Sequence, residues 1–261
     1  MFRHRSTQIM AILNATPDSF SGDGTLQVAT IVAQAERALA QGAALLDLGA
    51  ESTRPGATPV TLEEELRRIV PVVAALRGEF PDARLSIDTS KPEVFAAAAA
   101  LGAQVLNLVR PLEEAHLAVV RDANAGLILT QAGIEPTEGI DAVLRSLLAS
   151  AQRAVTYGIA PEQVMLDPGF GFGKTPAQNL ALLGSLGRLH ALPFASMLAA
   201  SRKSTLGHIT GRAVQEREFA TAATTAMAAH ARIDFVRVHD VAAAHDVLSI
   251  YAAVDSASAR T

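Results

Sequence analysis

The sequence is notable first for the residues that it lacks. It contains no cysteine and no tryptophan in 261 residues, and aromatic residues make up only 4% of the chain. The lack of cysteine excludes disulfides and thiolate metal centres and is compatible with a cytoplasmic location. No uninterrupted apolar run approaches the roughly 18 residues of a spanning helix, and the basic start "MFRHRSTQIM" precedes too short an apolar run for a signal peptide. We therefore expect a soluble, cytoplasmic globular protein.

The chain also lacks a strong excess of charge of either sign. Its 22 basic and 26 acidic residues give a formal net charge of −4, which leaves no whole-chain signature of nucleic-acid or anionic-membrane binding. What is abundant is aliphatic, since apolar residues make up 49% of the chain. We expect neither nucleic acid nor a membrane as a partner, although a local basic cluster could still bind a small anion.

Short aliphatic runs alternate with longer segments of helical period along the whole chain. The predicted strands are 9–14, 44–49, 84–89, 104–109, 126–131, 163–168, 193–201 and 235–240. The predicted helices are 25–41, 61–77, 90–102, 141–157, 176–190, 216–232 and 242–254. Eight buried strands with helical crossovers favour an α/β fold, a single-domain (β/α)8 TIM barrel over residues 1–261. A doubly wound open sheet is the alternative, but it usually has fewer strands.

Polar residues end almost every predicted strand. In such a barrel the active site is built at the C-terminal ends of the strands. The residues at these positions are Asn14, Asp47 with Glu51, Asp88, Asn107, Thr130 with Gln131, Asp167, Ser201-Arg202-Lys203, and Arg237 with His239. Any one of them could simply terminate a strand. Taken together, they favour one shared ligand site.

The types of residue at the strand ends indicate the chemistry of the ligand. Asp88 and Asp167 accept hydrogen bonds when ionised, and Asn107 can both donate and accept, which suits the donor edge of an aminopyrimidine-like ring. The last two strands bring cations to the place where barrels commonly hold phosphate: Arg202, Lys203, Arg237 and His239. Asn14 is a plausible weak Mg²⁺ ligand shared with phosphate oxygens. The residues therefore predict a heteroaromatic ring that carries an anionic tail.

Three loops carry weaker signals. "NATPDSFSGDG" and "ESTRPGAT" are rich in hydroxyl groups, glycine and proline and read as lids over phosphate or as ordinary surface turns. "DPGFGFGKT" (167–175) resembles a phosphate loop but has Pro168 where the spacing requires glycine. Its glycines are expected to allow tight turns, and Phe172 either faces a planar ligand or packs in the core. The histidines outside the strand ends show no zinc-binding spacing.

Six of these segments together resemble the dihydropteroate synthase family. They are "ILNATPDSFS", "GAESTRPGA", "SIDTSKPEV", "LDPGFGFGKT", "SRKS" and "RVHDV", and they occur in the family's order from about Met10 to Val241. The resemblance implies a (β/α)8 barrel that joins dihydropterin pyrophosphate to p-aminobenzoate, releases pyrophosphate and uses Mg²⁺. It also implies a homodimer formed through the last helices.

The resemblance assigns roles by position. Pterin binding falls to Asp88, Asn107, Asp167, Lys203 and Arg237. Pyrophosphate binding falls to Asn14, Arg237 and His239, with Asn14 also the metal ligand. Binding of p-aminobenzoate falls to Thr53, Arg54, Pro55, Phe172, Lys203 and Ser204. Lys203, Asp88, Asp167 and Arg237 are the expected catalytic residues.

The chain departs from the family pattern at four positions: Leu108, Thr130, Gln131 and Ala199. All four are expected to alter the wall of the pterin pocket. They leave open a divergent paralog that acts on a modified pterin or arylamine, or a protein that binds pterin without turnover. A pterin-dependent methyltransferase is a third alternative, but it should lack "SRK" and "RVHD" because it has no pyrophosphate to expel.

Overall fold

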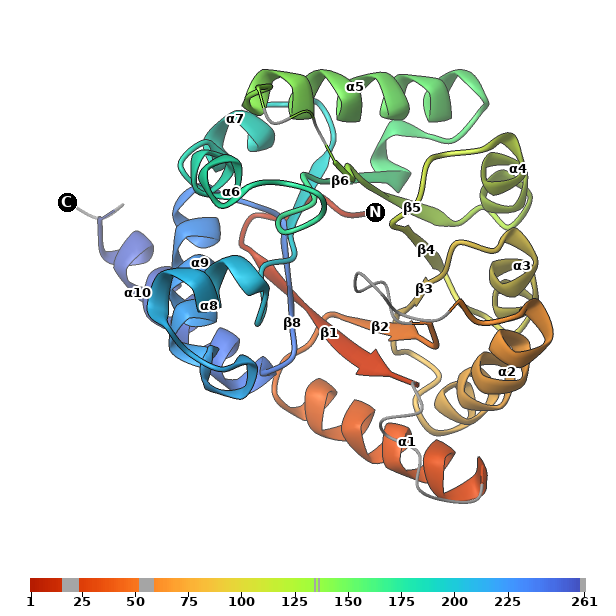
Figure 1. Cartoon of the computed structure of the whole chain (residues 1–261). Coiled ribbons are helices and arrows are strands. Elements are labelled where there is room, and N and C mark those ends of the chain that lie inside the picture. The colour runs from red at the N-terminus through yellow and green to blue at the C-terminus, as the bar shows by residue number, and fades with distance from the viewer. Residues whose placement is uncertain (16–23, 52–58, 134, 136, 259–261) are drawn as a thin grey trace.

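The computed structural model describes residues 1–15, 24–51, 59–133, 135 and 137–258. Within these residues eight parallel strands form a closed barrel in sequence order, β1 to β8 (Figure 1). They are β1 (Gln8–Asn14), β2 (Leu45–Gly49), β3 (Leu85–Asp88), β4 (Val105–Leu108), β5 (Gly126–Thr130), β6 (Val164–Asp167), β7 (Ala195–Leu198) and β8 (Phe235–Val238). The predicted barrel is confirmed, and the open sheet is wrong, because β1 pairs with both β2 and β8.

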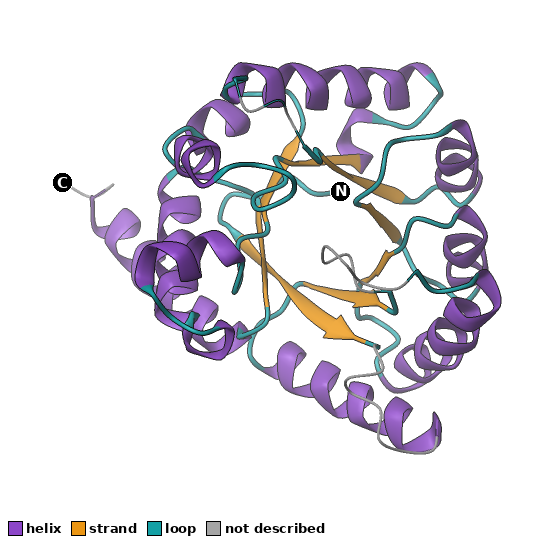
Figure 2. Ribbon diagram, in the orientation of Figure 1, coloured by secondary structure: helices purple, strands orange, loops and turns teal. Residues whose placement is uncertain are grey.

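Helices surround the strands on all sides (Figure 2). In chain order they are α1 (Gly24–Ala40), α2 (Leu62–Glu79), α3 (Pro92–Ala100), α4 (Glu114–Asp122), α5 (Ile140–Thr156), α6 (Pro176–Leu183), α7 (Leu186–His190), α8 (Ser204–Thr210), α9 (Glu218–His230) and α10 (Val241–Ser258). Two short 3₁₀ turns, Pro161–Gln163 and Val214–Glu216, precede β6 and α9. No helix in the described part of the chain is both long and apolar enough to cross a membrane.

Local sequence signals explain where several helices begin and end. The Thr61 hydroxyl accepts a hydrogen bond from the Glu64 amide at 3.3 Å and caps α2. Pro92 is the first residue of α3, and Gly102 follows its end with a φ of 101°. The predicted helix 176–190 is confirmed at both ends but is not continuous, because it divides into α6 and α7 at Gly184 and Ser185. Helices α4 and α8, of nine and seven residues, were not predicted, whereas the equally short α3 was recognised by Pro92 and Gly102 at its ends.

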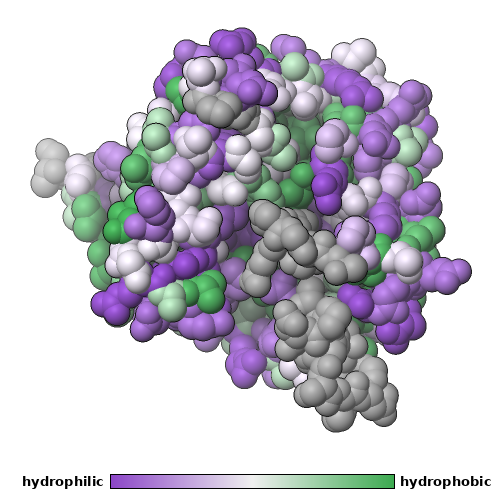
Figure 3. Space-filling model, viewed as in Figure 1, coloured by the Kyte–Doolittle hydropathy of each residue, from purple (hydrophilic) through white to green (hydrophobic). Residues whose placement is uncertain are grey.

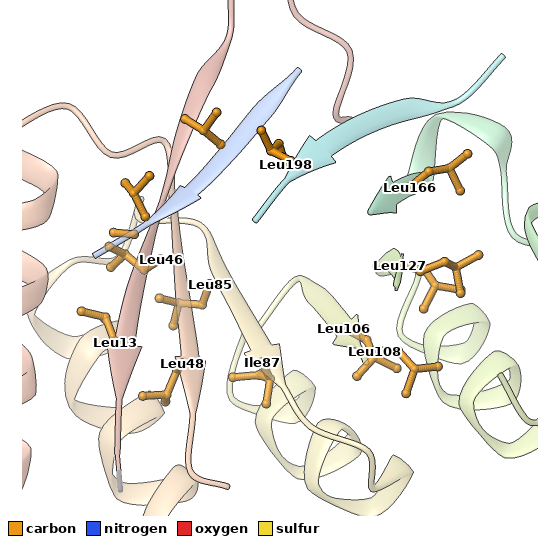
Figure 4. Close-up of a cluster of buried hydrophobic side chains, with 14 of the residues drawn as sticks. Leu13, Leu46, Leu48, Leu85, Ile87, Leu106, Leu108, Leu127, Leu166 and Leu198 are labelled. Carbon is orange, nitrogen blue, oxygen red and sulfur yellow. The ribbon is translucent and has the colours of Figure 1, made fainter. Parts of the chain in front are cut away.

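Alternation along each strand divides the core into two parts. One face of the strands packs outward against the helices, through the leucines and isoleucine labelled in Figure 4. The other face fills the barrel with Met10, Leu45, Val105, Ile128, Met165, Ala195, Met197 and Phe235, joined by Phe2 from the segment before β1 and by Ala199 directly after β7. Residues two positions after an inner residue share its face, so Asp47 and Asn107 continue the inner series of Leu45 and Val105. The barrel interior is therefore apolar below and polar at its C-terminal end.

Candidate active site

Four polar residues from β2, β3, β4 and β8 form a connected group at the C-terminal end of the barrel interior. We call this group, Asp47, Asp88, Asn107 and Arg237, the carboxylate floor. Arg237 Nε lies 2.6 Å from Asp47 Oδ2, and its Nη2 lies 2.9 Å from Asp88 Oδ2. Asn107 Nδ2 donates to the same Asp47 oxygen at 3.0 Å. Three of the four residues are at least nine-tenths buried, and Arg237 is largely so.

The charges of the floor influence one another. Burial raises the pKa of Asp88 to about 7, and the Asp47 carboxyl adds to this rise although Arg237 opposes it. Burial acts against the charge of Arg237 as well, but the carboxyl groups of Asp47 and Asp88 hold its pKa above the ordinary value. Among the described residues, Asp47 Oδ1 and Asn107 Oδ1 are buried and have no hydrogen-bond partner. The floor therefore keeps acceptor atoms to which a ligand's N–H groups can donate.

Across the barrel mouth, β6 and the residues after β7 bring a carboxyl group and a lysine together. Asp167 ends β6, and its Oδ1 accepts from the Gly169 amide at 2.9 Å. Burial raises the pKa of Asp167, against the influence of Lys203. Lys203 Nζ donates to the carbonyl of Phe170 and lies 4.1 Å from the centre of the Phe172 ring. Burial lowers the pKa of Lys203 to about 8.

A second lysine holds the loops after β5 and β6 together. Lys174 Nζ lies 2.9 Å from the carbonyl oxygen of Gln131, 2.7 Å from its Oε1 and 3.1 Å from the carbonyl oxygen of Gly169. Burial lowers the pKa of Lys174 to about 8, against the influence of Asp167. We call Gln131, Asp167, Lys174 and Lys203, with the carbonyls that bind the two lysines, the lysine side. Sequence reasoning assigned no role to Lys174, although its place in the glycine-rich loop was the available signal.

The glycine-rich loop makes the tight turns that the sequence predicts. Gly169, Gly171 and Gly173 all have a positive φ, between 60° and 79°. A Cβ at Gly169 would lie 1.8 Å from the Gln131 carbonyl oxygen, and one at Gly171 would lie 2.9 Å from Cδ of Lys203. Glycine is therefore required for the backbone conformation and for the close approach of both neighbours. Phe172 is half-buried beside Lys203, whereas Phe170 is the aromatic residue that packs in the core.

The remaining predicted site residues lie at the rim. His239 follows β8, and its Nδ1 lies 2.9 Å from the hydroxyl oxygen of Ser201. Asn14 is exposed as the last residue of β1, and Ser204 is exposed as the first residue of α8. Thr53, Arg54 and Pro55 lie outside the described residues, as do most of the two loops that were read as lids.

Several predictions about the site are corrected by the structure. Arg202 was grouped with the phosphate-binding cations, but its guanidinium pairs with Glu218 of α9. Leu108 was expected in the pterin wall, yet it belongs to the outer core and faces the helices (Figure 4). Gln131 binds Lys174 and the Gly133 carbonyl through its side-chain amide, so it braces a loop.

Of the four departures, Thr130 and Ala199 remain in the barrel interior. Ala199 belongs to the inner core, and Thr130 continues the inner series of Ile128. The buried Thr130 hydroxyl has no hydrogen-bond partner among the described residues. Thr130 and Ala199 are therefore the two departures from the family pattern that face the barrel interior.

Asp47 is the site residue whose importance sequence reasoning underestimated. Its position at a strand end was noted, but it received no role, whereas the structure places it in contact with both Asn107 and Arg237. The signal that could have found it is its spacing, because Asp47 stands two residues after the buried Leu45 and so faces the interior. Among the described residues, no group of three His, Cys, Asp or Glu side chains could hold a metal ion.

Comparison with known proteins gives a consistent result for sequence and structure. The sequence pattern of the family described as pterin binding enzyme matches residues 10–239. The dihydropteroate synthase of Synechocystis sp. is 38% identical over 259 residues, covering 94% of this chain and 89% of that protein. The Escherichia coli dihydropteroate synthase is 37% identical over 261 residues, covering 95% and 92%.

Solved structures of the same kind superpose closely. A Xanthomonas albilineans dihydropteroate synthase with 4-aminobenzoic acid matches with a TM-score of 0.90 and 40% identity, covering 96% of this chain and 94% of that chain. A Burkholderia cenocepacia dihydropteroate synthase complexed with 7,8-dihydropteroate matches with a TM-score of 0.88 and 39% identity, covering 98% and 94%. The similarity therefore extends over nearly the whole chain in both sequence and fold.

Proposed function

The chain belongs to the dihydropteroate synthase family of pterin binding enzymes, and from this we propose the reaction that it catalyses. It condenses 6-hydroxymethyl-7,8-dihydropterin pyrophosphate with p-aminobenzoate, giving 7,8-dihydropteroate and pyrophosphate. This proposal rests on one observation: hydrogen-bond acceptors and cations lie together at the C-terminal end of the barrel. Asp88, Asn107 and Asp167 offer buried acceptors for a ring, and Arg237 and His239 follow from β8 to receive an anion.

The floor and Asp167 bind the pterin ring in this proposal. A pterin presents N–H donors on its aminopyrimidine edge, and Asp88, Asp167 and the Asn107 carbonyl are acceptors. Burial raises the pKa values of both aspartates because it disfavours their charged form. A ligand N–H that donates to a carboxylate favours the charged form and so offsets part of the desolvation cost. Lys203 carries the complementary donor for the ring's carbonyl oxygen, and Arg237 lies against the ring beside the departing anion.

The chemistry follows from where charge develops. Cleavage of the bond to pyrophosphate leaves positive charge on the pterin methylene and negative charge on the leaving group. The carboxyl groups of Asp88 and Asp167 stabilise the first, and Arg237 and His239 stabilise the second. The aniline nitrogen then attacks the methylene carbon and loses a proton, a step that needs orientation more than a strong base. We assign Phe172, Lys203 and Ser204 to the p-aminobenzoate, and the family resemblance adds Thr53, Arg54 and Pro55, which lie outside the described residues.

The residues present fit Mg²⁺ as a cofactor shared with the substrate. Asn14 offers one neutral oxygen at the exposed end of β1, and the described residues offer no cluster that could hold a metal alone. This agrees with the coordination preference of Mg²⁺, which usually keeps several water ligands and binds few protein groups beside substrate phosphates. When bound, the ion would neutralise pyrophosphate oxygens, while Arg237 and His239 bind the remaining charge.

We also propose that the enzyme is a cytoplasmic homodimer joined through its last helices. Helices α9 and α10 pack side by side, with the His230 and Tyr251 rings edge to face at 6.4 Å. Their outer faces expose Phe219 at 92% and Ile250 at 69% of their surface, and Figure 3 shows apolar side chains at this edge. A second copy of the chain would cover them. Sedimentation of the purified protein tests this, with Ile250→Asp expected to give monomers.

One observation supports the alternative of an altered or absent turnover. Thr130 and Ala199 differ from the family pattern and face the barrel interior, so they can change the fit of the ring. The test supplies dihydropterin pyrophosphate, p-aminobenzoate and Mg²⁺, detects dihydropteroate by mass spectrometry, and measures pterin binding by calorimetry on the same sample. Product at a rate well above the uncatalysed reaction supports the synthase. Saturable pterin binding without product would overturn it in favour of a binding protein.

A further inference from the structure

The turn that delivers Lys203 to the site contains an unusual backbone conformation. Arg202 has a φ of 57°, one of three positive values among the described residues that are not glycine. The other two, Asn124 and Arg232, follow the ends of α4 and α9, where a left-handed residue is a common way to end a helix. Arg202 lies between β7 and α8, so no helix end accounts for it. Such a conformation is unfavourable for a residue other than glycine and persists only where the surrounding contacts hold it.

The start of α9 contacts Arg202 from both sides of its peptide. The Arg202 amide donates to the Thr221 hydroxyl oxygen at 3.2 Å. The Arg202 carbonyl accepts from Nη1 of Arg217 at 2.9 Å. The Arg202 side chain pairs with Glu218, so all three contacts come from one turn of helix and the residue before it.

These contacts are themselves firmly placed. The Thr221 hydroxyl donates to the Arg217 carbonyl at 2.9 Å, which orients its lone pairs toward the Arg202 amide. The Arg217 guanidinium lies against Gly207 of α8, where a Cβ would come within 2.2 Å of Nη2. Thr221 is buried, so its hydrogen bond with Arg202 is shielded from water.

The two neighbours of Arg202 both face the site. Ser201 lies 2.9 Å from Nδ1 of His239, and Lys203 reaches the Phe170 carbonyl and the Phe172 ring. A change of Arg202 to an ordinary right-handed or extended conformation would redirect one of these side chains, because the backbone between them sets their relative direction. The left-handed residue is thus what allows both to face the same site.

We propose that Thr221 and Arg217 are positioning residues for the reaction, holding Arg202 left-handed so that Ser201 and Lys203 both reach the site. The inference rests on the proposed function only in the use of Lys203 by the substrates. The start of α9, a helix on the outside of the barrel, thus influences the reacting centre through Arg202. Neither residue touches a substrate in this scheme.

The test is a cycle of variants at positions 221 and 202. Thr221→Val keeps the shape but loses the acceptor, and we expect kcat/KM to fall about tenfold because the left-handed conformation of Arg202 then loses one of the contacts that hold it. Arg202→Gly should retain most of the activity, because glycine adopts the left-handed conformation freely. In the Arg202→Gly background, Thr221→Val should cost little. Thr224→Val is the matched control, since the buried Thr224 hydroxyl donates to the Thr221 carbonyl and does not contact Arg202.

The outcomes separate this role from a general structural one. An equal loss from Thr221→Val in both backgrounds, or no loss in the native background, would overturn the proposal. Should Thr221→Val fail to fold, Arg202→Val and Arg202→Gly decide, because both remove the guanidinium but only valine resists the left-handed backbone. Equal activities of these two would also overturn it. A native protein without turnover would instead refute the proposed function, and the same cycle would then be read from the Kd of dihydropterin pyrophosphate.

Discussion

The carboxylate floor and the lysine side bury positive charge in different ways. In the floor, Arg237 has carboxyl oxygens at 2.6 and 2.9 Å, so its charge is matched. On the lysine side, Lys174 and Lys203 are bound mainly by carbonyl oxygens, which orient an ammonium group without cancelling its charge. The pKa values move accordingly: Arg237 rises under the influence of Asp47 and Asp88, whereas burial lowers those of both lysines to about 8.

This difference indicates separate tasks for the two regions. Removing one member of a buried ion pair lowers the stability of the folded state strongly, because the charge of the other member is left buried without a partner. An unmatched buried ammonium costs stability and is retained where a ligand will supply the missing negative charge. We therefore expect damage to the floor to appear in folding as well as in catalysis, and damage to the lysine side to appear in catalysis alone.

The largest expected effect is the loss of Arg237. Arg237→Met leaves the buried Asp47 and Asp88 without their cation, and the free energy of unfolding should fall by about 3–5 kcal/mol. Urea unfolding at pH 7 measures the change. Lys203→Met is the matched control, a similar removal of a cation from the lysine side that should leave stability unchanged or raised. If the two variants were equally destabilised, the proposed division of tasks would be wrong.

The next effect concerns turnover. Lys203→Ala and Asp167→Asn should each lower kcat/KM by roughly 10²–10³, the usual loss when a group that stabilises transition-state charge is removed. Both proteins should remain folded by circular dichroism and thermal melting, because these side chains are proposed to serve the ligand. Unfolding in place of inactivity would show that they are structural residues.

Much of the fold followed from short-range signals in the sequence. Eight buried runs and their order predicted the closed barrel, and the cap at Thr61 and the proline at Pro92 marked helix starts that the structure confirms. The seven-residue α8 was missed because so short a helix depends on tertiary contacts more than on period. The break between α6 and α7 was missed for a related reason, since the apolar pattern continues across Gly184.

The site was predictable in its members but not in their pairing. Strand ends identified Asp88, Asn107, Asp167, Lys203 and Arg237, since any barrel brings them to one face. Sequence gives no distance, so it could not show that Arg237 would bind Asp47 or that Arg202 would turn to Glu218. That Leu108 and Asn107 face opposite ways follows from the alternation of neighbouring residues along a strand, and the expectation for Leu108 neglected it.

The third prediction uses pH to compare the two regions. Asp88 has a pKa of about 7 in the folded state against an ordinary value of 3.8, so the folded state binds more protons and stability falls as pH rises through this range. Lys174 and Lys203 have pKa values of about 8 against 10.5, so the unfolded state binds more protons and stability rises from about pH 8 to 10.5. Each group contributes a slope of at most about 1.4 kcal/mol per pH unit.

Unfolding free energies measured from pH 4 to 10.5 test these slopes by difference. The unfolding free energy of the native protein minus that of the Asp88→Asn variant should fall with pH on the acid side and be flat above about pH 8. The unfolding free energy of the native protein minus that of the Lys174→Met variant should be flat on the acid side and rise on the alkaline side. A slope of the same sign for both pairs would contradict the contrast between the floor and the lysine side.

The smallest expected effect lies within the lysine side, at Gln131. Gln131→Met removes the Oε1 that lies 2.7 Å from Lys174 Nζ but keeps the main-chain carbonyl that binds the same atom at 2.9 Å. Two hydrogen bonds are lost, because Nε2 of Gln131 also donates to the Gly133 carbonyl, so we expect a cost of about 2–3 kcal/mol, measured by thermal melting and urea unfolding. In a Lys174→Met background the cost should fall to about 1 kcal/mol, because only the hydrogen bond from Nε2 to the Gly133 carbonyl is then left to lose. If Gln131→Met cost as much in that background, the contact between Gln131 Oε1 and Lys174 would contribute nothing to stability, and the bracing role of Lys174 through this side chain would be wrong.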